Sequence, residues 1–468
     1  MLFNSIEFFM FLPAVLLIYR YLNLRCQNIF LVGASYFFYG WWDWRFLGLI
    51  LISTVVDYFC GRSIYFAKNK HDAKRFVLLS IVVNISILMF FKYFNFFSDS
   101  FTHALSLIGY SPSWFEVNVV LPVGISFYTF QTITYSVDVY RRRVKATHSF
   151  VDFSLFVSFF PQLVAGPIET ASSLLPQIQN PRKIVSYNYT SGGVLILWGL
   201  VKKVFIADNL STFVDASYSN YASLSAVEVA LVSVAFACQI YCDFSGYSDI
   251  ARGTARLLGF ELRLNFNLPY FAKNPSDFWR RWHMSLSDWL KQYLYISMGG
   301  NRKGTLVTYR NLMLTMLLGG LWHGAAWTFV MWGAYHGFLL CAHRYISSNF
   351  KLPTNKYFSI CSVFLMFIFT CYGWLIFRCD SFRQLAVMTS RLFSTWGIGW
   401  EKIINDVEFV GGYIWPLILI QLLQFITKDM SFYLKFYKSV QHCLIALGIY
   451  LLFVYGSIQS PGFIYFQF

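Results

Sequence analysis

Long apolar runs alternate with short polar segments along almost the whole chain. A helix needs about 20 apolar residues to cross the hydrocarbon core of a bilayer. The clearest candidates are residues 6–19, 46–60, 76–91, 192–207, 226–242, 309–322, 328–342, 357–377, 413–425 and 443–455. Less regular candidates are residues 29–38, 119–139 and 150–164. The pattern predicts an all-α, polytopic integral membrane protein.

Several of these runs are short, and glycine, proline or polar residues interrupt others. Short runs favour re-entrant or protein-buried helices over helices that face lipid. In FPQLVAGPIE (160–169), two prolines and a glycine should break a helix, either as a buried kink or where the chain lines a cavity. No low-complexity linker separates a soluble module, and no inverted repeat is visible. We therefore expect one transmembrane domain over residues 1–468.

Basic residues gather in alternate loops. Arg20 and Arg25 follow the first apolar run, residues 61–75 are strongly basic, residues 93–118 contain no Lys or Arg, and residues 141–145 are basic again. Because cytoplasmic loops carry an excess of Lys and Arg, this alternation predicts an N-terminus outside the cytoplasm. The first run lacks a basic segment before it and a small-residue cleavage site after it, which favours a retained span over a signal peptide.

Composition supports a membrane location and excludes two other classes of protein. The chain is 57% hydrophobic and 13% charged, against about 25% charged residues in soluble domains. The net charge is +15, but the basic residues lie in short loops and form no stripe on a soluble module, which excludes nucleic-acid binding. Cys238 and Cys242 have no histidine at metal-ligand spacing, so we expect buried thiols and no metal site. Membrane lipid is the partner that the composition implies.

The first motif whose residues could take part in a reaction is DFWRRWHMSLSDWL (277–290), within the longest polar stretch of the chain. His283, Ser287 and Lys291 share one helical face, and bulky apolar residues occupy another. This spacing predicts a single amphipathic helix that starts near Pro275 and lies at a membrane surface. The alternative without chemistry is an interfacial helix with tryptophan anchors and a solvated basic face.

The second motif, GGLWHGAAWT (319–328), places His323 in a segment without Asp, Glu, Lys or Arg from residue 311 to residue 342. An ionisable residue at membrane depth is costly and indicates a functional site. A neutral imidazole accepts a proton from a hydroxyl group near pH 7. The small residues around it let a backbone or a slender ligand approach. The alternative is a structural histidine between helices, and His336 fits a structural or interfacial role better.

The third motif, QIYCDFSGYSD (239–249), sets Asp243 and Asp249 among hydroxyl groups where an apolar run ends. A metal site there would need histidines or further carboxylates nearby, and the sequence supplies none in this segment. The composition favours the alternative, a polar turn with capping side chains.

Together these motifs resemble the membrane-bound O-acyltransferase family, and in particular its bacterial glycan O-acetyltransferase branch. The matching segments, in the order of that family, are VGISFYTF (123–130), AGPI (165–168), DFSGYSD (243–249), WRRWHMSLS (279–287), GLWHGAAW (320–327) and FIYFQF (463–468). They span most of the chain. The branch includes the membrane subunits of alginate and peptidoglycan O-acetylation, and the teichoic-acid D-alanylation subunit is a more distant relative.

The resemblance implies a ring of tilted helices, with short re-entrant helices, around a central funnel. It implies that His323 matches the essential membrane histidine of the family and that His283 matches its second motif histidine. The other motif residues expected to line the substrate path are Trp282, Ser287, Arg280, Arg281, Asp243, Trp322, Gly320 and Gly324. The two arginines would meet donor phosphates, or they simply follow the positive-inside pattern. Gln162 and Thr170 depart from the alginate-type pattern, which weakens the transfer of alginate as substrate but not of acyl transfer.

We expect an O-acyltransferase of the bacterial inner membrane. It would move an acyl group, most simply acetyl from acetyl-CoA in the cytoplasm, toward an extracytoplasmic polysaccharide such as alginate or peptidoglycan. A partner transferase outside the membrane would complete the transfer, and no cofactor would be bound permanently. Two alternatives stay open. One is a lipid or protein O-acyltransferase of the same family, and the other is a transporter or flippase without chemistry, which should show inverted repeats and intramembrane charge pairs.

The route of the acyl group follows from these expectations. His283 would lie at the cytoplasmic surface and His323 deeper, where it acts as general base or relays the acyl group. A tunnel wide enough for a pantetheine arm would join them and continue outward. Bulky substitutions at Gly320 or Gly324 should then block the tunnel and leave membrane insertion intact.

Overall fold

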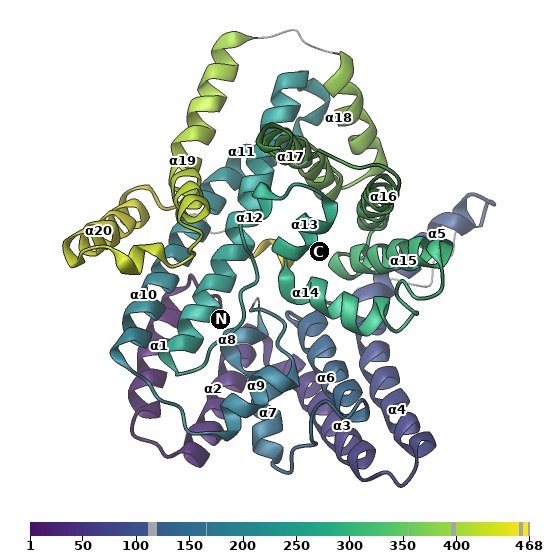
Figure 1. The fold of residues 1–468 in the computed structure, drawn as a ribbon, viewed down its shortest axis with the longest axis vertical. Coiled ribbons are helices and arrows are strands. Elements are labelled where there is room, and N and C mark those ends of the chain that lie inside the picture. Colours follow the sequence, from purple (N-terminus) through teal and green to yellow (C-terminus); the bar gives the residue numbers. More distant parts are fainter. Residues whose placement is uncertain (111–118, 165, 354, 395–398, 458–461, 467–468) are drawn as a thin grey trace. The chain divides into compact units, whose positions relative to one another are not determined.

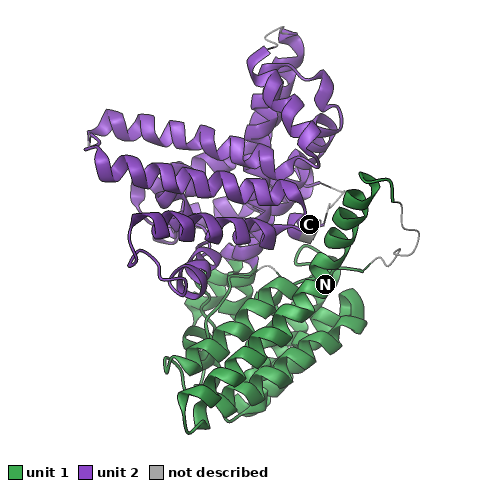
Figure 2. Cartoon of the chain, turned by 90° about the vertical axis from the view of Figure 1, so that its right-hand side faces the viewer, with its two compact units in different colours: residues 1–193, 251–263 green, residues 194–250, 264–468 purple. Residues whose placement is uncertain are grey.

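The structure, a computed structural model, is built from helices and describes residues 1–110, 119–164, 166–353, 355–394, 399–457 and 462–466 (Figure 1). No strand occurs in these residues, which confirms the all-α prediction. Three residues of the quoted motifs, Ala165, Gln467 and Phe468, lie outside them. The chain forms two compact units, residues 1–193 with 251–263 and residues 194–250 with 264–468 (Figure 2). The single-domain organisation and the ring around a funnel stay predictions.

Unit 1 consists mainly of the N-terminal helices. Its helices are α1 (Ile6–Tyr19), α2 (Leu24–Asp43), α3 (Leu47–Phe66), α4 (Lys70–Leu88), α5 (Phe94–Ser106), α6 (Ile125–Tyr140), α7 (Phe150–Ser158), α8 (Phe160–Leu163) and α9 (Ala171–Gln179). Side chains cap several of them, since Asn23, Asn69 and Ser149 accept backbone N–H bonds at the starts of α2, α4 and α7. Residues 160–164 are buried, and Phe160 N–H donates to Ser35 Oγ at 3.1 Å, so the broken segment forms a buried kink.

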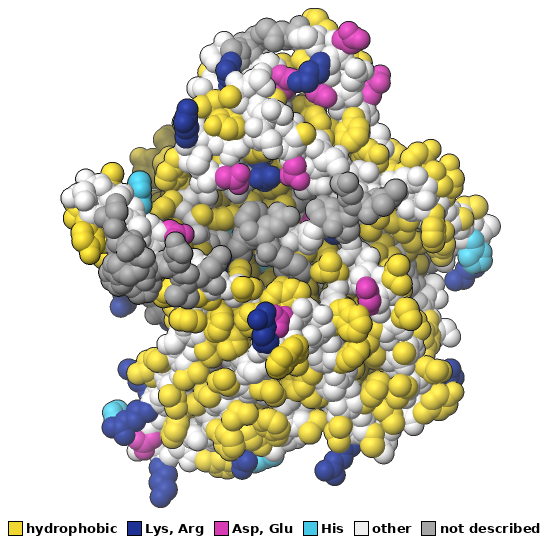
Figure 3. Space-filling view, turned by 180° about the vertical axis from the view of Figure 1, so that it is seen from behind, with side chains coloured by type: hydrophobic (Ala, Val, Ile, Leu, Met, Phe, Trp, Pro, Cys, Tyr) yellow, Lys and Arg dark blue, Asp and Glu magenta, His cyan; other side chains and the backbone are white. Residues whose placement is uncertain are grey.

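The basic loops of unit 1 lie at one end of its helices. Arg142 donates to the carbonyl of Tyr65 at 3.1 Å, and Tyr58 donates to the carbonyl of His148 at 2.7 Å. These bonds tie the loop between α6 and α7 to the end of α3. Lys and Arg side chains gather along the lower edge in Figure 3. This grouping fits the charge alternation, and the orientation of that end toward the cytoplasm stays a prediction.

Unit 2 holds most of the C-terminal helices. Its helices are α11 (Asp208–Ser219), α13 (Pro275–Arg281), α14 (Met284–Trp289), α15 (Thr305–His323), α16 (Trp327–Asn349), α17 (Lys356–Arg378), α18 (Phe382–Ser394), α19 (Trp400–Thr427) and α20 (Lys438–Tyr455). Two helices contribute residues to both units, α10 (Ser186–Leu200) and α12 (Ala226–Leu257). A π-helical segment, η3 (Val201–Ala207), joins α10 to α11.

Seven helical stretches of the described chain are long and apolar enough to cross a membrane. They are Leu24–Phe66, Lys70–Ser106, Ser186–Ser219, Ala226–Leu257, Lys356–Arg378, Trp400–Thr427 and Lys438–Tyr455. The expected spans 309–322 and 328–342 are helical in α15 and α16, but they are not among the seven, and α1 is a shorter apolar helix. Large apolar side chains cover much of the surface, such as Phe453 at 87% exposure (Figure 3). Such a surface needs lipid around it, so the chain is a polytopic membrane protein.

Candidate active site

His323 is the last residue of α15, within unit 2. Gly324 ends the helix in an extended conformation, and α16 begins three residues later at Trp327. The imidazole is buried, with 3% exposure. Aromatic rings surround it, with centroid distances of 4.9 Å to Trp332, 5.0 Å to Trp322, 5.5 Å to Tyr465 and 5.8 Å to Phe377. The histidine therefore sits in an aromatic pocket from which bulk water is largely excluded.

The small residues beside His323 let the two helices of the hairpin touch. A Cβ atom at Gly320 would overlap the carbonyl of Phe329 and lie 3.0 Å from Gly333 Cα in α16, and one at Gly324 would overlap the Phe329 ring. The expectation that added side chains there would occupy a channel is therefore wrong, because they would meet packed protein. The role of Gly320 and Gly324 as substrate-binding residues stays a prediction.

His283 breaks the helix that the sequence pattern predicted. Asn274 caps α13, accepting the Asp277 N–H at 2.8 Å, and the chain leaves the helix at Trp282. His283 then adopts a left-handed conformation, with φ 41° and ψ 55°, before α14 begins at Met284. The single amphipathic helix is therefore wrong. So is its solvated face, because the His283 side chain is fully buried. A non-glycine residue in this conformation needs support from its surroundings.

Asn265 supplies that support, and the sequence analysis missed it. Its backbone carbonyl accepts the Met284 N–H at 2.9 Å, and its Oδ1 accepts the Ser285 hydroxyl at 2.9 Å. His283 Nδ1 lies 3.2 Å from the same Oδ1. Because Oδ1 is already the acceptor of these bonds, Nδ1 carries the proton and the lone pair of the neutral ring is on Nε2. Burial lowers the pKa of His283 to about 3, so the ring is neutral at pH 7.

The two motif histidines are neighbours. Their ring centroids are 6.5 Å apart, and Trp322 lies beside both, 6.0 Å from His283 and 5.0 Å from His323. The expectation that His283 lies at the surface, apart from a deeper His323, is therefore wrong. The structure brings both imidazoles into one pocket of unit 2.

The remaining residues of the 279–287 motif take different places. Trp282 is fully buried and packs against Trp374, with centroids 4.6 Å apart, while Ser287 donates to the Trp282 carbonyl at 3.2 Å. Arg281 donates to Asp277 Oδ1 at 2.9 Å within α13 and is half-buried, whereas Arg280 is exposed. Of the two arginines, Arg280 is thus the one accessible to a donor phosphate.

Asp243 lies inside α12, so the predicted polar turn at residues 239–249 is wrong. Lys203 of η3 holds it in place, with Nζ 2.6 Å from Asp243 Oδ1 and 2.7 Å from Asp208 Oδ1. The other oxygen of Asp243, Oδ2, accepts the backbone N–H of Ile464 at 2.7 Å. Lys203 was not among the predicted site residues, although a lysine within an apolar run is a recognisable signal.

The C-terminal segment 462–466 reaches the histidines through this contact. Tyr465 follows Ile464, and its ring lies 5.5 Å from His323 and 4.5 Å from Phe244. Its hydroxyl is buried and has no hydrogen-bond partner among the described residues. Burial raises the pKa of Tyr465, so the phenol is protonated at neutral pH. The structure therefore adds a third polar side chain to the pocket.

Other polar residues of unit 2 do not join this group. His336 is buried among Trp332, Trp279 and Phe278, and Trp332 lies between it and His323. Among the described residues, no group of three or more His, Cys, Asp or Glu side chains could hold a metal ion. Lys202 pairs with Asp249 at 2.6 Å, so intramembrane charge pairs do occur, as a transporter would also show.

The pocket suits acyl transfer in its chemistry. Two buried imidazoles can take a proton from an attacking hydroxyl group and return it to a leaving group. The phenol of Tyr465 offers a hydroxyl group beside them, and the aromatic walls keep water from competing for an activated acyl group.

Comparison with known proteins gives the family. The model of the MBOAT, membrane-bound O-acyltransferase family matches residues 36–382. The probable alginate O-acetylase AlgI of Pseudomonas aeruginosa is 40% identical, over 90% of this chain and 80% of that protein. The peptidoglycan O-acetyltransferase of Helicobacter pylori is 34% identical, over 100% of this chain and 98% of that protein. The teichoic acid D-alanyltransferase of Bacillus subtilis is 27% identical over 57% of this chain and 71% of that protein.

The family match and the position of the two histidines agree on the type of protein. The family match covers the segments that carry His283 and His323, and the structure places these two residues in one buried pocket. The match also decides against a transporter without chemistry, which the charge pairs alone could not do. The chain belongs to the membrane-bound O-acyltransferase family and is an O-acyltransferase of the membrane.

Proposed function

We propose that this chain moves an acetyl group from acetyl-CoA at the cytoplasmic side of the bacterial inner membrane toward an extracytoplasmic polysaccharide. The observation that carries the chemistry is the buried group of His323, His283 and Tyr465. The acceptor class rests on relatives that are named for the O-acetylation of alginate and of peptidoglycan and that align with most of the chain.

In this mechanism His323 is the general base. As a hydroxyl oxygen attacks the carbonyl carbon of the thioester, the imidazole takes the hydroxyl proton, and the proton then passes to the departing thiolate. A positioned base contributes about 10²- to 10⁴-fold to the rate. His283, oriented by Asn265, is the second group that can hold the proton. The Tyr465 hydroxyl group is placed to be a first acceptor of the acetyl group, because it is buried beside His323.

Two further parts of the proposal concern partners. Arg280 is exposed and would meet the phosphates of the donor, which favour arginine as a partner. A second protein outside the membrane would pass the acetyl group to the polysaccharide. The described residues support this step because they form membrane-type helices and contain no soluble module that would bind a glycan chain.

The test is mass spectrometry of alkali-labile acetate on cell-surface glycans, with the gene deleted and then restored. We expect the acetate to disappear on deletion and to return with the wild-type chain or with a His442→Ala control, whose histidine is exposed on α20. It should not return with His323→Ala at equal membrane abundance. Unchanged glycan acetate on deletion, with loss of acyl groups from a lipid or a protein instead, would overturn the acceptor class.

A further inference from the structure

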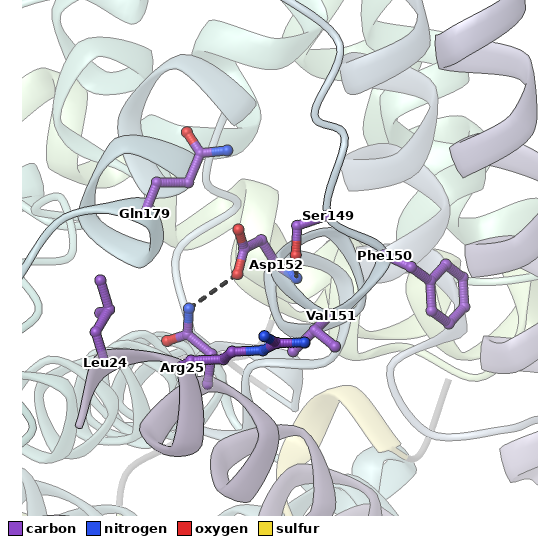
Figure 4. A pocket seen from close by; sticks show the side chains of 8 residues that line it. Leu24, Arg25, Ser149, Phe150, Val151, Asp152 and Gln179 are labelled. Atoms are coloured by element: carbon purple, nitrogen blue, oxygen red, sulfur yellow. Dashed lines mark hydrogen bonds between the residues drawn. The ribbon is translucent and has the colours of Figure 1, made fainter. Parts of the chain in front are cut away.

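A pocket of about 520 Å³ opens in unit 1, where α2 and α7 begin and α9 ends (Figure 4). Its lining residues are Leu24, Arg25, Asn28, Ser149, Phe150, Val151, Asp152 and Gln179. This volume is within the range of about 300–1,000 Å³ that is typical of small-molecule sites. None of the residues proposed above for acyl transfer lines it, so this pocket calls for a different ligand.

Two opposite charges face the pocket without pairing with each other. Asp152 accepts a hydrogen bond from Asn28 at 2.9 Å, and no ion pair joins it to Arg25. Arg25 is exposed and makes no hydrogen bond or ion pair with any residue that the structure describes. Figure 4 shows the Asp152 carboxylate and the Arg25 guanidinium on the same opening. A ligand that carries both an ammonium and an anionic group would satisfy both side chains.

Buried partners fix the orientation of the Asp152 carboxylate. Asn28, with 3% exposure, donates to Asp152 Oδ1 and accepts from Arg182 Nη2 at 2.8 Å. The Arg182 guanidinium lies over the Phe260 ring, 4.7 Å from its centroid. Ser149 Oγ, in turn, accepts the Asp152 N–H at 3.1 Å. A carboxylate held by a second layer of hydrogen bonds is pre-organised for a ligand and loses little conformational entropy on binding.

Gln179 also lines the pocket, and its Nε2 donates to Thr147 Oγ1 at 3.2 Å. The Asp152 carboxylate suits a primary ammonium group, which donates up to three hydrogen bonds. A quaternary ammonium group has no N–H to donate. The starts of α2 and α7, with Arg25, supply the positive end that an anionic group prefers.

The surroundings of the pocket resemble those of a membrane–water interface. It is at the end of unit 1 that carries the basic loops, because Tyr58 of α3 donates to the carbonyl of His148, next to Ser149. Phe150, on the rim of the pocket, is 41% exposed and presents an apolar ring beside the charged residues. Charged groups next to exposed apolar surface are typical of a membrane–water interface.

We propose that this pocket binds the headgroup of a zwitterionic phospholipid with a primary ammonium, of the phosphoethanolamine class. The phosphate pairs with Arg25, the ammonium pairs with Asp152, and the first carbons of the chains contact Phe150. An anionic headgroup without an amine offers nothing to Asp152. The chain thus has a specific lipid site in unit 1, separate from its acyl-transfer pocket.

The experiment uses the full chain, purified in detergent, and follows lipid binding by native mass spectrometry and by thermal stabilisation. The probes are dihexanoyl phosphatidylethanolamine, the choline and glycerol lipids with the same chains, and free phosphoethanolamine. We expect the ethanolamine lipid to bind about tenfold more tightly than the other two lipids and than the free headgroup.

Variants locate the site. Asp152→Asn should lose the tenfold preference, and Arg25→Gln should weaken the binding of all three lipids, because they share the phosphate. Arg20→Gln should change neither, since Arg20 is an exposed arginine of the same basic end that does not line the pocket. Should Asp152→Asn fail to fold, Arg25→Gln still tests the site, because Arg25 is exposed. Equal binding of the three lipids, preference for the glycerol lipid, equal binding of the free headgroup, or unchanged affinity in Arg25→Gln would each overturn the proposal.

Discussion

Lys203 should be among the most sensitive residues of the protein toward substitution. Its ammonium is 1% exposed and contacts two carboxylates, at 2.6 Å for Asp243 and 2.7 Å for Asp208, which are themselves buried. Lys203→Met keeps most of the side-chain volume but leaves both carboxylates without this cation. Breaking a buried ion pair from one side costs about 3–5 kcal/mol, because the remaining charge stays out of water. Two carboxylates depend on Lys203, so we expect at least the upper end of that range.

A loss of about 5 kcal/mol is a large part of the 5–15 kcal/mol that stabilises a typical protein. The assay is thermal unfolding of the purified protein in detergent, and the expected change is a fall in Tm of at least about 5 °C. Arg45→Met is the matched control. Its pair with Asp43 also spans 2.6 Å, but the arginine side chain is 68% exposed, so this change should leave Tm close to the wild-type value.

The double variant Lys203→Met with Asp243→Asn separates charge from packing. Removal of one negative charge should recover part of the lost stability, and the amide oxygen of the new asparagine can still accept the Ile464 N–H. The reasoning is refuted if Lys203→Met lowers Tm no more than Arg45→Met does, or if the second substitution adds its own full loss.

Four further predictions concern the pocket. His323→Ala should reach the membrane in normal amount and reduce acyl transfer by 10²-fold or more in a glycan acetate assay, and normal transfer would remove its catalytic assignment. Tyr465→Phe should unfold at the wild-type temperature yet lose activity, because it lacks only the hydroxyl group; full activity would contradict its role as acceptor. Gly320→Ala should lower stability by about 1–3 kcal/mol in thermal unfolding, since its Cβ meets the Phe329 carbonyl, and an unchanged Tm would show that the helices can move apart. Burial lowers the pKa of His283 to about 3, so between pH 6.5 and pH 3 only the unfolded chain gains this proton, and stability should fall on acidification more steeply than in His283→Gln.

Helix positions were largely readable from the sequence. The run 6–19 is α1, and the run 357–377 lies within α17 (Lys356–Arg378), because a continuous apolar run marks where a helix of a membrane protein lies. His323 was also singled out, since a histidine in an apolar segment is a rare and costly feature, and His283 through the motif around it. What the local pattern could not show is that these two segments meet.

The failures have one physical cause, a partner far away in the sequence. The spacing around His283 suits a continuous helix, and the break depends on Asn265, 18 residues earlier. Asp243 belongs to a polar stretch that favours a turn, yet α12 continues through it because Lys203 lies opposite its carboxylate. Hydrophobic periodicity and composition indicate the secondary structure that a segment prefers in isolation. Contacts with residues far away in the sequence override that preference.

The bond between Ile464 and Asp243 also has a consequence for biosynthesis. Its two residues are 221 positions apart, so Asp243 enters the membrane long before the segment that carries Tyr465 has been made. Translation proceeds at about 5–20 residues per second, which leaves roughly 10 s or more in which the histidines lack their tyrosine neighbour. On the proposed function, a nascent chain that stalls in this interval lacks the Tyr465 acceptor, so it should transfer no acyl group before this segment is in place.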